Sequence, residues 1–520
     1  MRRVLALVAA AVVAAGSTAV TVPARADTGS TTTYESIPGD GGTVLKAFVV
    51  RPTGRGNGPF PLLVMPSSWS LLDVEYVGAG VKLAKESGYV VVSYTSRGFW
   101  DSGGKIEVAG GPDTRDASKV IDWAVRNAHA DEHRVGMAGL SYGAGISLLT
   151  AAKDRRVRAV AAMSAWADLA ASLYPNQTVS EQTAAGLLAI GNITGRPGED
   201  MLKLQNAYLI DDIASALPLA GPRGVGSYLA QINANHPAVL IGNAWDDGIF
   251  PPSQITDFYG RFTGPKHLML QPGDHGSADG LGVVGLPNDV WAATTRWFDH
   301  YLNGTANGID GENPVELKAA NGGGWQGFPD WAGISSGTGR FYLGKGSLAA
   351  RAATGWSGRI DAGWPTVADS GVVEVTGVAQ QAGIPWKIKV AEVDRRFGGV
   401  WTAAPYARTT VVSGAPRLHT TITPSAATTS VFAYLYDVTP GGEGSLITHK
   451  PYTLRGATPG KAWTIDFRLE PIRWTVPAGH HLALVVDTTD IRYRSMSKPG
   501  ATVTFGSPAA DPSWLTVPTG

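Results

Sequence analysis

The sequence predicts an α/β domain with a mostly parallel sheet, followed by an all-β domain. Across residues 43–302, short β-branched runs alternate with helical patterns, as in sheets that helices cover on both faces. Residues 166–235 interrupt this alternation with helical patterns and no convincing strand. After residue 313, short alternating strands are separated by Gly, Pro and Ser turns, which is typical of a two-sheet sandwich or jelly roll.

The elements of the first domain follow from hydrophobic periodicity. Apolar, β-branched runs predict strands at 44–50, 61–65, 89–94, 134–138, 157–163, 238–242 and 266–271. Helical patterns predict helices at 76–87, 114–127, 141–153, 253–262 and 288–302. In the second domain, examples of predicted strands are 372–378, 418–422, 431–438, 463–469 and 482–487. We therefore place the domains at 27–312 and 313–520.

The interval 166–235 is predicted to be a helical cap inserted into the first domain. Open α/β sheets bind ligands at the carboxyl ends of their strands, so a cap at that edge would cover the site and shape its specificity. The alternative is a helical decoration without a functional role.

Composition limits the classes of partner. The 520 residues exceed what one hydrophobic core usually supports. The 43 basic and 43 acidic residues cancel, which gives no electrostatic footprint for nucleic acid or for an anionic membrane surface. The chain has no cysteine, hence no disulfide and no thiol nucleophile, and no metal motif or cofactor motif that passes its context test. A peptide or a small ester or amide is the expected partner, and the oligomeric state is left open.

The first 26 residues are predicted to be a secretory signal. Arg2 and Arg3 precede an apolar run at 4–15, and Ala24-Arg25-Ala26 is an A-x-A cleavage site. The apolar run is too short to span a bilayer, which takes about 20 residues. The mature protein is therefore expected outside the cell, without a membrane anchor.

Ser141 is the predicted nucleophile. It lies at the centre of the G-x-S-x-G pattern in residues 139–143, between a predicted strand and a predicted helix. Residues 333–337, GISSG, match the same pattern but lack that strand-turn-helix setting.

A serine hydroxyl needs a base within hydrogen-bond reach and a group that orients the base. In α/β-hydrolases the chain order is Ser, acid, His. His275 lies in a loop directly after a predicted strand, whereas His267 begins an apolar run and His300 sits in a helix. The acid is expected where the strand 238–242 ends, with Asp247 preferred to Asp246 because Gly248 permits a tight turn. A histidine base predicts a pH profile that rises near ~6.5.

The oxyanion donors are predicted less completely. The backbone N–H of Tyr142 follows the nucleophile and is one donor by the geometry of the elbow. The second comes from the loop 66–69, where Ser67, Ser68 and the indole of Trp69 are alternatives.

With these residues placed, the chain resembles the Xaa-Pro dipeptidyl-peptidase and cocaine esterase-like serine hydrolase family. Four stretches carry the resemblance: 96–103 with its S-R-G and S-G pairs, 122–143 leading into the S-Y-G elbow, W-D-D-G at 245–248, and FAYLYDVTPGG at 432–442. The resemblance implies the triad Ser141, Asp247 and His275, a helical cap, and a jelly-roll, galactose-binding-like C-terminal domain.

Two departures from the family limit what the resemblance implies. Ser67 stands where relatives carry a tyrosine that donates to the oxyanion, which leaves the second donor open. Relatives that bind a substrate ammonium have acidic residues shortly after the triad aspartate, where this chain has Ile249 and Phe250. An acid from the cap, Asp168 or Glu181, is an alternative. Trp69, Trp166, Asp168 and Phe250 are our candidates for the substrate pocket.

Two function hypotheses follow. The first is a secreted serine hydrolase that cleaves an amide or ester through an acyl-enzyme, either as a Xaa-Pro dipeptidyl-peptidase or as a carboxylesterase or acylase of the cocaine esterase type. The second, of another class, is a secreted glycan- or cell-wall-binding protein with an inert hydrolase domain, because jelly rolls also bind sugars.

Overall fold

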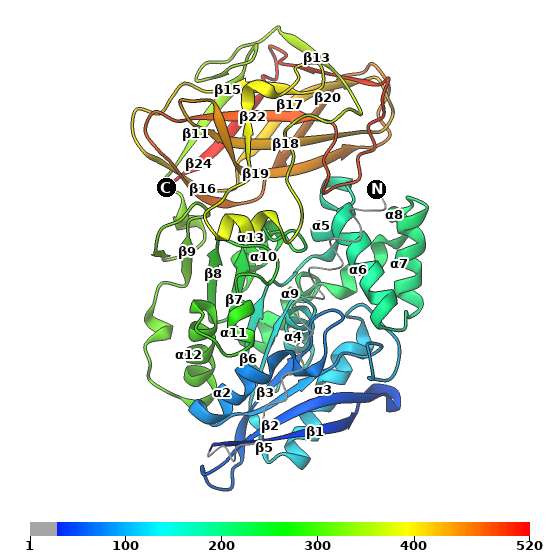
Figure 1. Cartoon of the computed structure of the whole chain (residues 1–520), viewed down its shortest axis with the longest axis vertical. Coiled ribbons are helices and arrows are strands. Elements are labelled where there is room, and N and C mark those ends of the chain that lie inside the picture. The colour runs from blue at the N-terminus through cyan, green and yellow to red at the C-terminus, as the bar shows by residue number, and fades with distance from the viewer. Residues whose placement is uncertain (1–28) are drawn as a thin grey trace.

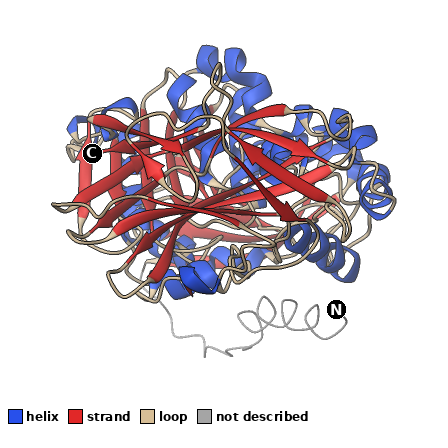
Figure 2. Ribbon diagram, turned by 90° about the horizontal axis from the view of Figure 1, so that it is seen from above, coloured by secondary structure: helices blue, strands red, loops and turns tan. Residues whose placement is uncertain are grey.

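The computed structural model describes residues 29–520, which form two parts stacked along the long axis (Figure 1). The first part contains a ten-stranded sheet with helices, and the second contains a nine-stranded and a five-stranded sheet. Seen from above, with the second part nearest the viewer, the strands of the second part lie in front of the helices of the first part (Figure 2). The predicted export signal, residues 1–26, lies outside the described residues. Within 29–520, no helix combines the length and apolar character needed to cross a membrane.

The ten-stranded sheet has the strand order β1-β2-β4-β3-β5-β6-β7-β8-β9-β10. The block from β4 to β9 is parallel, and antiparallel strands flank it on both sides. All seven predicted strands of this domain are confirmed. The strands are β1 (Ser30–Pro38), β2 (Val44–Pro52), β3 (Phe60–Pro66), β4 (Val90–Tyr94), β5 (Ala130–Leu140), β6 (Val157–Met163), β7 (Ala238–Ala244), β8 (Lys266–Gln271), β9 (Val315–Lys318) and β10 (Trp325–Phe328).

Helices cover both faces of this sheet, and alternate strand residues serve the two faces. Leu62 and Val64 of β3 belong to one apolar cluster, and Leu63 and Met65 belong to the other. The first cluster includes residues of α3 (Gly111–Asn127), α4 (Tyr142–Lys153) and α10 (Pro252–Arg261); the second includes residues of α2 (Val77–Ser87) and α12 (Asp289–Asn303). Burial on both faces explains why these strands are almost wholly apolar. A short helix, α11 (Gly280–Val283), precedes α12.

The interval 166–235 lies between β6 and β7 and is helical, as predicted. Its α-helices are α5 (Leu169–Leu173), α6 (Glu181–Thr194), α7 (Glu199–Leu209), α8 (Ile213–Ala216) and α9 (Leu229–Asn235). Only isolated bridges, such as the one between Phe99 and Gly195, add β pairing to this interval in the described chain. The helices of this interval lie beside the strand ends (Figure 1).

The first sheet continues past the predicted domain boundary. Residues after 312 first form β9, which pairs with β8, and β10, which pairs with β9, before the chain enters the second part. Short strands separated by Gly-rich turns look alike whichever sheet they join, so their composition does not show that these two extend the first sheet.

The second domain consists of two antiparallel sheets that share an apolar layer. In β18 (Thr429–Val438), Val431, Ala433 and Leu435 join the cluster that contains Leu418 of β17, whereas the alternate residues join a third cluster. The other strands are β11 (Gly337–Leu343), β12 (Leu348–Ala349), β13 (Ser357–Asp361), β14 (Lys387–Lys389), β15 (Gly399–Thr402), β16 (Thr410–Gly414), β17 (Arg417–Pro424), β19 (Glu443–Leu454), β20 (Trp463–Arg468), β21 (Ile472–Val476), β22 (His481–Asp487), β23 (Thr502–Gly506) and β24 (Trp514–Thr519).

One predicted strand of this domain is wrong. Residues 372–378 form a turn that leads into a short helix, α13 (Thr376–Gln381). The hydroxyl of Thr376 accepts the N–H of Val372 at 2.8 Å, and Glu374 has a φ of 67°. A side-chain hydrogen bond of this kind competes with strand pairing, which the alternation of valines does not reveal.

Candidate active site

Ser141 occupies a sharp turn between β5 and α4. Its backbone has φ 56° and ψ −119°, which is unusual for a residue with a side chain. The turn is held in place because the N–H of Ser141 donates to the carbonyl of Met163 on β6 at 2.9 Å. The side chain is therefore fixed at the carboxyl end of the sheet, ahead of the first turn of a helix.

The glycines around Ser141 are required by close packing. A Cβ on Gly139 would lie 2.4 Å from the carbonyl carbon of Gly143, and a Cβ on Gly143 would lie 2.0 Å from the carbonyl oxygen of Pro66. A Cβ on Gly145 would lie 2.1 Å from the ring of Trp166. The pattern therefore reflects the approach of β3, α4 and the cap to one turn.

Three side chains from different strand ends meet at this turn. The Oγ of Ser141 lies 2.7 Å from Nε2 of His275, in the loop after β8. The Nδ1 of His275 lies 3.0 Å from Oδ1 and 3.1 Å from Oδ2 of Asp247, in the loop after β7. These distances suit proton transfer from a hydroxyl to an imidazole that a carboxylate orients.

The two neighbouring aspartates have different partners. Oδ1 of Asp247 also accepts the N–H groups of Ile249 at 3.0 Å and Phe250 at 2.7 Å, which fixes the carboxylate against the histidine. Asp246 pairs with Arg492 of the second domain, at 3.0 and 3.3 Å. The sequence preference for Asp247 therefore agrees with the geometry, and Asp246 connects the two domains.

The other two candidate histidines lie elsewhere. Nε2 of His267 faces Glu316 at 3.4 Å, and Nδ1 of His300 lies 3.2 Å from the carbonyl oxygen of Thr305. Neither is in hydrogen-bond contact with Ser141 or Asp247.

Asp274 holds the loops of the site together, a role that the sequence analysis missed. Its carboxylate accepts the N–H of Gly248 and the N–H of His275, both at 2.8 Å. Gly248 belongs to the loop 245–248 that carries Asp247, called the acid loop below. The other carboxylate oxygen of Asp274 accepts the N–H of Glu374 from the second domain, also at 2.8 Å. An aspartate in a Pro-Gly-Asp-His loop reads as a turn former, so no local signal distinguishes it.

Glu374 is the second missed residue and comes from the second domain. It lies beside α13, which Figure 1 shows between the second domain and the ends of β7 and β8. Gly377 of α13 approaches so closely that a Cβ there would lie 2.7 Å from Cβ of Asp274. Burial and the Asp274 carboxylate raise the pKa of Glu374, and the charge of His275 opposes this shift. A second acid therefore faces the histidine.

The predicted oxyanion loop is used differently from its sequence interpretation. The N–H of Ser67 donates to the carbonyl of Tyr94 at 2.9 Å, and its hydroxyl accepts the N–H of Ser96 at 3.1 Å. Ser67 therefore does not offer its backbone N–H, contrary to what its position suggested. The N–H of Ser68 donates to Glu75 at 2.7 Å, and the indole of Trp69 donates to the carbonyl of Leu187 in the cap at 3.0 Å.

Tyr142 stays the predicted first oxyanion donor. It is the first residue of α4, where a backbone N–H has no acceptor within the helix. Its phenol is anchored on the far side, because the hydroxyl accepts the N–H of Ala109 at 2.6 Å and lies 3.3 Å from Asp113.

Three of the four pocket candidates form a chain of rings beside the site. Phe250 lies edge-on to His275 with centroids 5.3 Å apart, Trp166 lies 4.9 Å from Phe250, and Trp69 lies 5.1 Å from Tyr142. Asp168 is the exception, since its carboxylate caps α5 by accepting the N–H of Ala171 at 3.0 Å.

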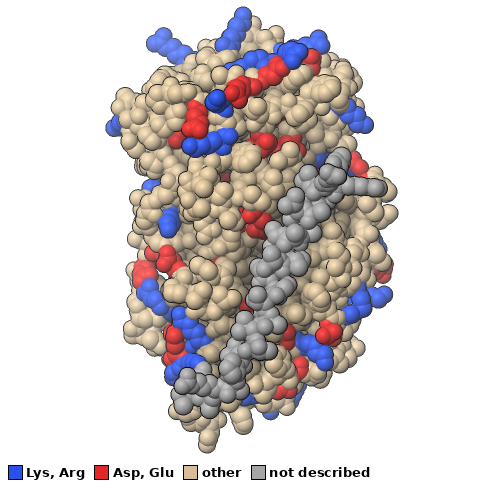
Figure 3. All heavy atoms as spheres, in the orientation of Figure 1, with Lys and Arg blue, Asp and Glu red and all other residues tan. Residues whose placement is uncertain are grey.

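The cap acids do not supply a free charge to the site. Beside Asp168, whose carboxylate serves α5, Glu181 pairs with Arg494 of the second domain at 2.8 Å and accepts the hydroxyl of Tyr208 at 2.7 Å. The described residues contain no cluster of three or more His, Asp or Glu able to hold a metal. Figure 3 shows basic and acidic side chains interspersed on the visible face.

The charges around His275 favour its protonated form. Burial lowers the pKa of the imidazole, but the carboxylate of Asp247, its hydrogen bond, Glu374 and Asp274 outweigh burial and raise the pKa to about 9. The pH profile is therefore expected to rise above ~6.5, because the fold brings acids to the imidazole that raise its pKa.

Comparisons with known proteins match both parts of the chain. The family model described as X-Pro dipeptidyl-peptidase (S15 family) matches residues 40–277, and the model of the X-Pro dipeptidyl-peptidase C-terminal non-catalytic domain matches residues 307–511. A predicted Xaa-Pro dipeptidyl-peptidase of Bacillus cereus is 22% identical over 502 residues, covering 88% of this chain and 78% of its own length.

Two solved structures share the fold along almost the whole chain. An aminopeptidase from a marine sediment Thaumarchaeota archaeon superposes with a TM-score of 0.74 at 14% identity, covering 97% of this chain and 98% of its own. An α-amino acid ester hydrolase gives a TM-score of 0.70 at 16% identity, with 97% and 100% coverage. The order of a hydrolase domain and a mostly β C-terminal domain is therefore shared.

We expect Asp274→Ala to destabilise the protein by about 3 kcal/mol, because one buried and two partly buried N–H groups lose their acceptor. Denaturant unfolding of the full chain measures this loss. Asp212→Ala, which removes an exposed carboxylate in the cap, is the matched control and should change stability by less than about 0.5 kcal/mol. Equal stability of the two variants would show that Asp274 does not hold the loops.

We expect the rate at which a fluorophosphonate modifies Ser141 to rise about tenfold per pH unit below a limit near 9. The reason is that only neutral His275 accepts the proton of the hydroxyl, and its pKa is raised. Quenching the reaction at set times and measuring the labelled fraction by mass spectrometry gives the rate at each pH. A plateau already reached at pH 7 would contradict the raised pKa.

Proposed function

Because the chain belongs to the X-Pro dipeptidyl-peptidase (S15) family, and is on that ground a hydrolase, we propose that it cleaves amide or ester bonds by a serine mechanism. The observation that carries the proposal is the contact of Ser141 with His275 at 2.7 Å and of His275 with Asp247 at 3.0 Å. Three groups from three strand ends in this order are the parts that acyl transfer needs.

The proposed reaction proceeds through an acyl-enzyme. As Oγ of Ser141 attacks the substrate carbonyl carbon, its proton passes to Nε2 of His275, and Asp247 stabilises the imidazolium. The leaving group takes that proton when its bond to carbon breaks, and the acyl group stays on Ser141. Water then attacks the ester carbonyl carbon and gives a proton to His275. His275 passes this proton to Oγ of Ser141 as the ester bond breaks, which releases the acid and restores the hydroxyl.

We assign the oxyanion to two backbone N–H groups. One is that of Tyr142 at the start of α4. The other is that of Trp69, because the N–H groups of Ser67 and Ser68 already donate to Tyr94 and Glu75. The loop thus replaces the tyrosine hydroxyl that the family resemblance implies.

We propose peptides with a free amino terminus, cleaved after a Xaa-Pro pair, as the substrates. Glu374 supports this choice, because its carboxyl acts on His275, no salt bridge to Lys or Arg is formed by it among residues 29–520, and burial raises its pKa. A substrate ammonium would supply the missing cation and favour the ionised carboxylate. An esterase or acylase is the alternative, supported by the apolar Ile249 and Phe250 after the acid loop.

Export and the finer architecture are part of the proposal. The signal pattern at 1–26 supports secretion of the mature chain. The two antiparallel sheets of the second domain support a jelly-roll arrangement.

Ser141→Ala is expected to lower kcat by about 10⁴ to 10⁶ with little change in the unfolding midpoint, because only the contact of the hydroxyl with His275 is lost. Hydrolysis of p-nitrophenyl esters and Xaa-Pro-p-nitroanilides measures the loss. Ser335→Ala, which alters the second G-x-S-x-G match, is the control and should keep full activity. A folded wild-type protein that no fluorophosphonate labels would instead favour the glycan- or cell-wall-binding hypothesis.

Glu374→Gln is expected to lower kcat/KM for Xaa-Pro-p-nitroanilides by about 10- to 100-fold, as loss of a charge-assisted hydrogen bond does. Amino-blocked versions of the same substrates should change little, since they carry no ammonium. Glu181→Gln, in the cap, is the control acid. An equal loss on free and blocked substrates would show that Glu374 does not bind the amine.

A further inference from the structure

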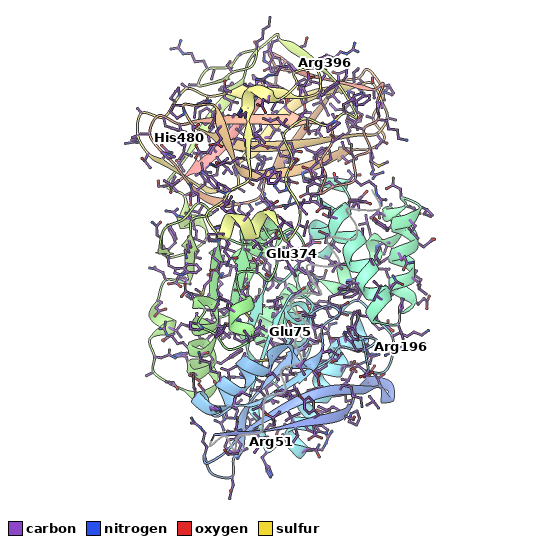
Figure 4. All side chains as sticks on the ribbon, viewed as in Figure 1. Arg51, Glu75, Arg196, Glu374, Arg396 and His480 are labelled. Atoms are coloured by element: carbon purple, nitrogen blue, oxygen red, sulfur yellow. The ribbon has the colours of Figure 1, made fainter. Side chains whose placement is uncertain are left out.

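A group of buried and partly buried polar side chains lies behind the turn that carries Ser141. Glu75 and Tyr76 belong to a short 3-10 helix, η2 (Asp73–Tyr76), that follows the loop with Ser68. Figure 4 shows Glu75 among the elements of the first domain, well apart from Glu374. The proposed reaction does not use Glu75, so its place in this group calls for another explanation.

The group holds both backbone polar groups of Leu140, the residue directly before Ser141. The N–H of Leu140 donates to the hydroxyl of Tyr76 at 2.8 Å. The carbonyl of Leu140 lies 2.9 Å from the hydroxyl of Ser68. Because Ser141 itself has an unusual φ of 56°, the preceding peptide decides where its side chain points.

Glu75 fixes Ser68 in turn. One carboxyl oxygen of Glu75 accepts the N–H of Ser68 at 2.7 Å, and the other lies 2.6 Å from the hydroxyl of Ser68. The same carboxyl therefore controls the peptide before Ser141 and the loop whose next N–H, that of Trp69, we assign to the oxyanion.

Counting hydrogens indicates which form of Glu75 fits these distances. The hydroxyl of Ser68 has one hydrogen, yet two oxygens lie within 2.9 Å of it: one from Glu75 and the carbonyl of Leu140. An ionised Glu75 would leave one of these pairs of oxygens without a hydrogen between them. A protonated Glu75 donates to Ser68, and Ser68 then donates to Leu140, which satisfies every contact.

The surroundings of Glu75 agree with this form. Burial raises the pKa of its carboxyl to about 7, although hydrogen bonds from Ser68 and Tyr76 oppose the shift. In the described part of the chain no Lys, Arg or His pairs with it. The titratable group that faces it is the phenol of Tyr76, whose pKa burial raises well above its usual value, so that it stays neutral.

We propose that Glu75 is a positioning residue that acts as a neutral acid: its proton completes a chain of hydrogen bonds through Ser68 to Leu140, which aims Ser141 and sets the oxyanion loop. The proposal rests on the proposed function of Ser141.

The test compares Glu75→Gln with Glu75→Ala in the full chain. Glutamine offers an acceptor oxygen and an NH2 group that donates, so it can replace both contacts of a neutral acid. The labelling rate of Glu75→Gln by a fluorophosphonate and its kcat should therefore stay within about threefold of wild type. Alanine should lower both by about 100-fold with little change in KM, because the nucleophile is displaced. Glu86→Gln on α2, an exposed acid, is the control and should change neither quantity.

A second measurement detects the proton itself. A buried acid with a raised pKa makes the folded state less stable as pH rises, because the unfolded chain releases that proton at a lower pH. Between pH 4.5 and about 7, the unfolding constant of wild type should therefore rise relative to that of Glu75→Gln, by up to about tenfold per pH unit. Parallel pH profiles of the two proteins would overturn the neutral form.

The remaining outcomes are also decisive. If glutamine lowers labelling as far as alanine, the ionised carboxylate is required and the proposal is wrong. If Glu75→Ala does not fold, Ser68→Ala tests the chain independently, since it removes the hydroxyl that joins Glu75 to Leu140; unchanged labelling would overturn the proposal. If wild type is labelled but the variants do not behave as expected, only the role of Glu75 is wrong. If wild type is not labelled, the proposed serine mechanism is wrong as well.

Discussion

The site depends first on the carboxylate of Asp274. Three N–H groups converge on it, from Gly248 in the acid loop, from His275, and from Glu374 in the second domain. The backbone that carries the acid, the backbone that carries the base and a segment of the other domain therefore share one acceptor. Because these hydrogen bonds are buried or partly buried, releasing one of the N–H groups carries much of the cost of an unsatisfied donor. The second domain is thus a structural part of the site.

This arrangement gathers more negative charge than an isolated site tolerates. Asp247, Asp274 and Glu374 act on one histidine, Asp246 lies next to Asp247 in the chain, and burial raises the pKa of Asp246, Asp274 and Glu374. Arg492 of the second domain offsets part of this charge by pairing with Asp246 and donating to the carbonyl of Ser370 at 2.6 Å. The remaining negative charge stabilises protonated His275 and so raises its pKa. A bound cation would relieve the same repulsion, which links the charge of the site to the amine proposed for the substrate.

The sequence predicted those parts of the site whose signal is local. Ser141 follows a strand and precedes a helix within one motif, and Asp247 and His275 follow single strands in the order that the fold requires. Residues that act across the chain escaped prediction. Glu374 lies 99 positions after His275 in an interval whose alternating valines predicted a strand, and only the tertiary contact with Asp274 shows its place. Ser67 matched the position of a donor, but its N–H is already engaged by the neighbouring strand. The fold was predictable to the level of its elements because hydrophobic periodicity is local, whereas the sheet that β9 and β10 join is decided by packing.

Backbone strain is the means by which these distant residues meet. Ser141, Ser164 and Glu374 all have positive φ, at 56°, 47° and 67°, although none is glycine. Each is held by hydrogen bonds from neighbouring segments: Ser141 donates its N–H to Met163, and Ser164 donates its N–H to Gly242 while its hydroxyl accepts the N–H of Gly276. The strained residues thus lie at the strand ends and in the segment from the second domain that touch the histidine loop. Since ordinary side chains occupy these positions, the sequence contains no glycine to mark them, and the site becomes visible only once the sheet, the cap and the second domain are in place.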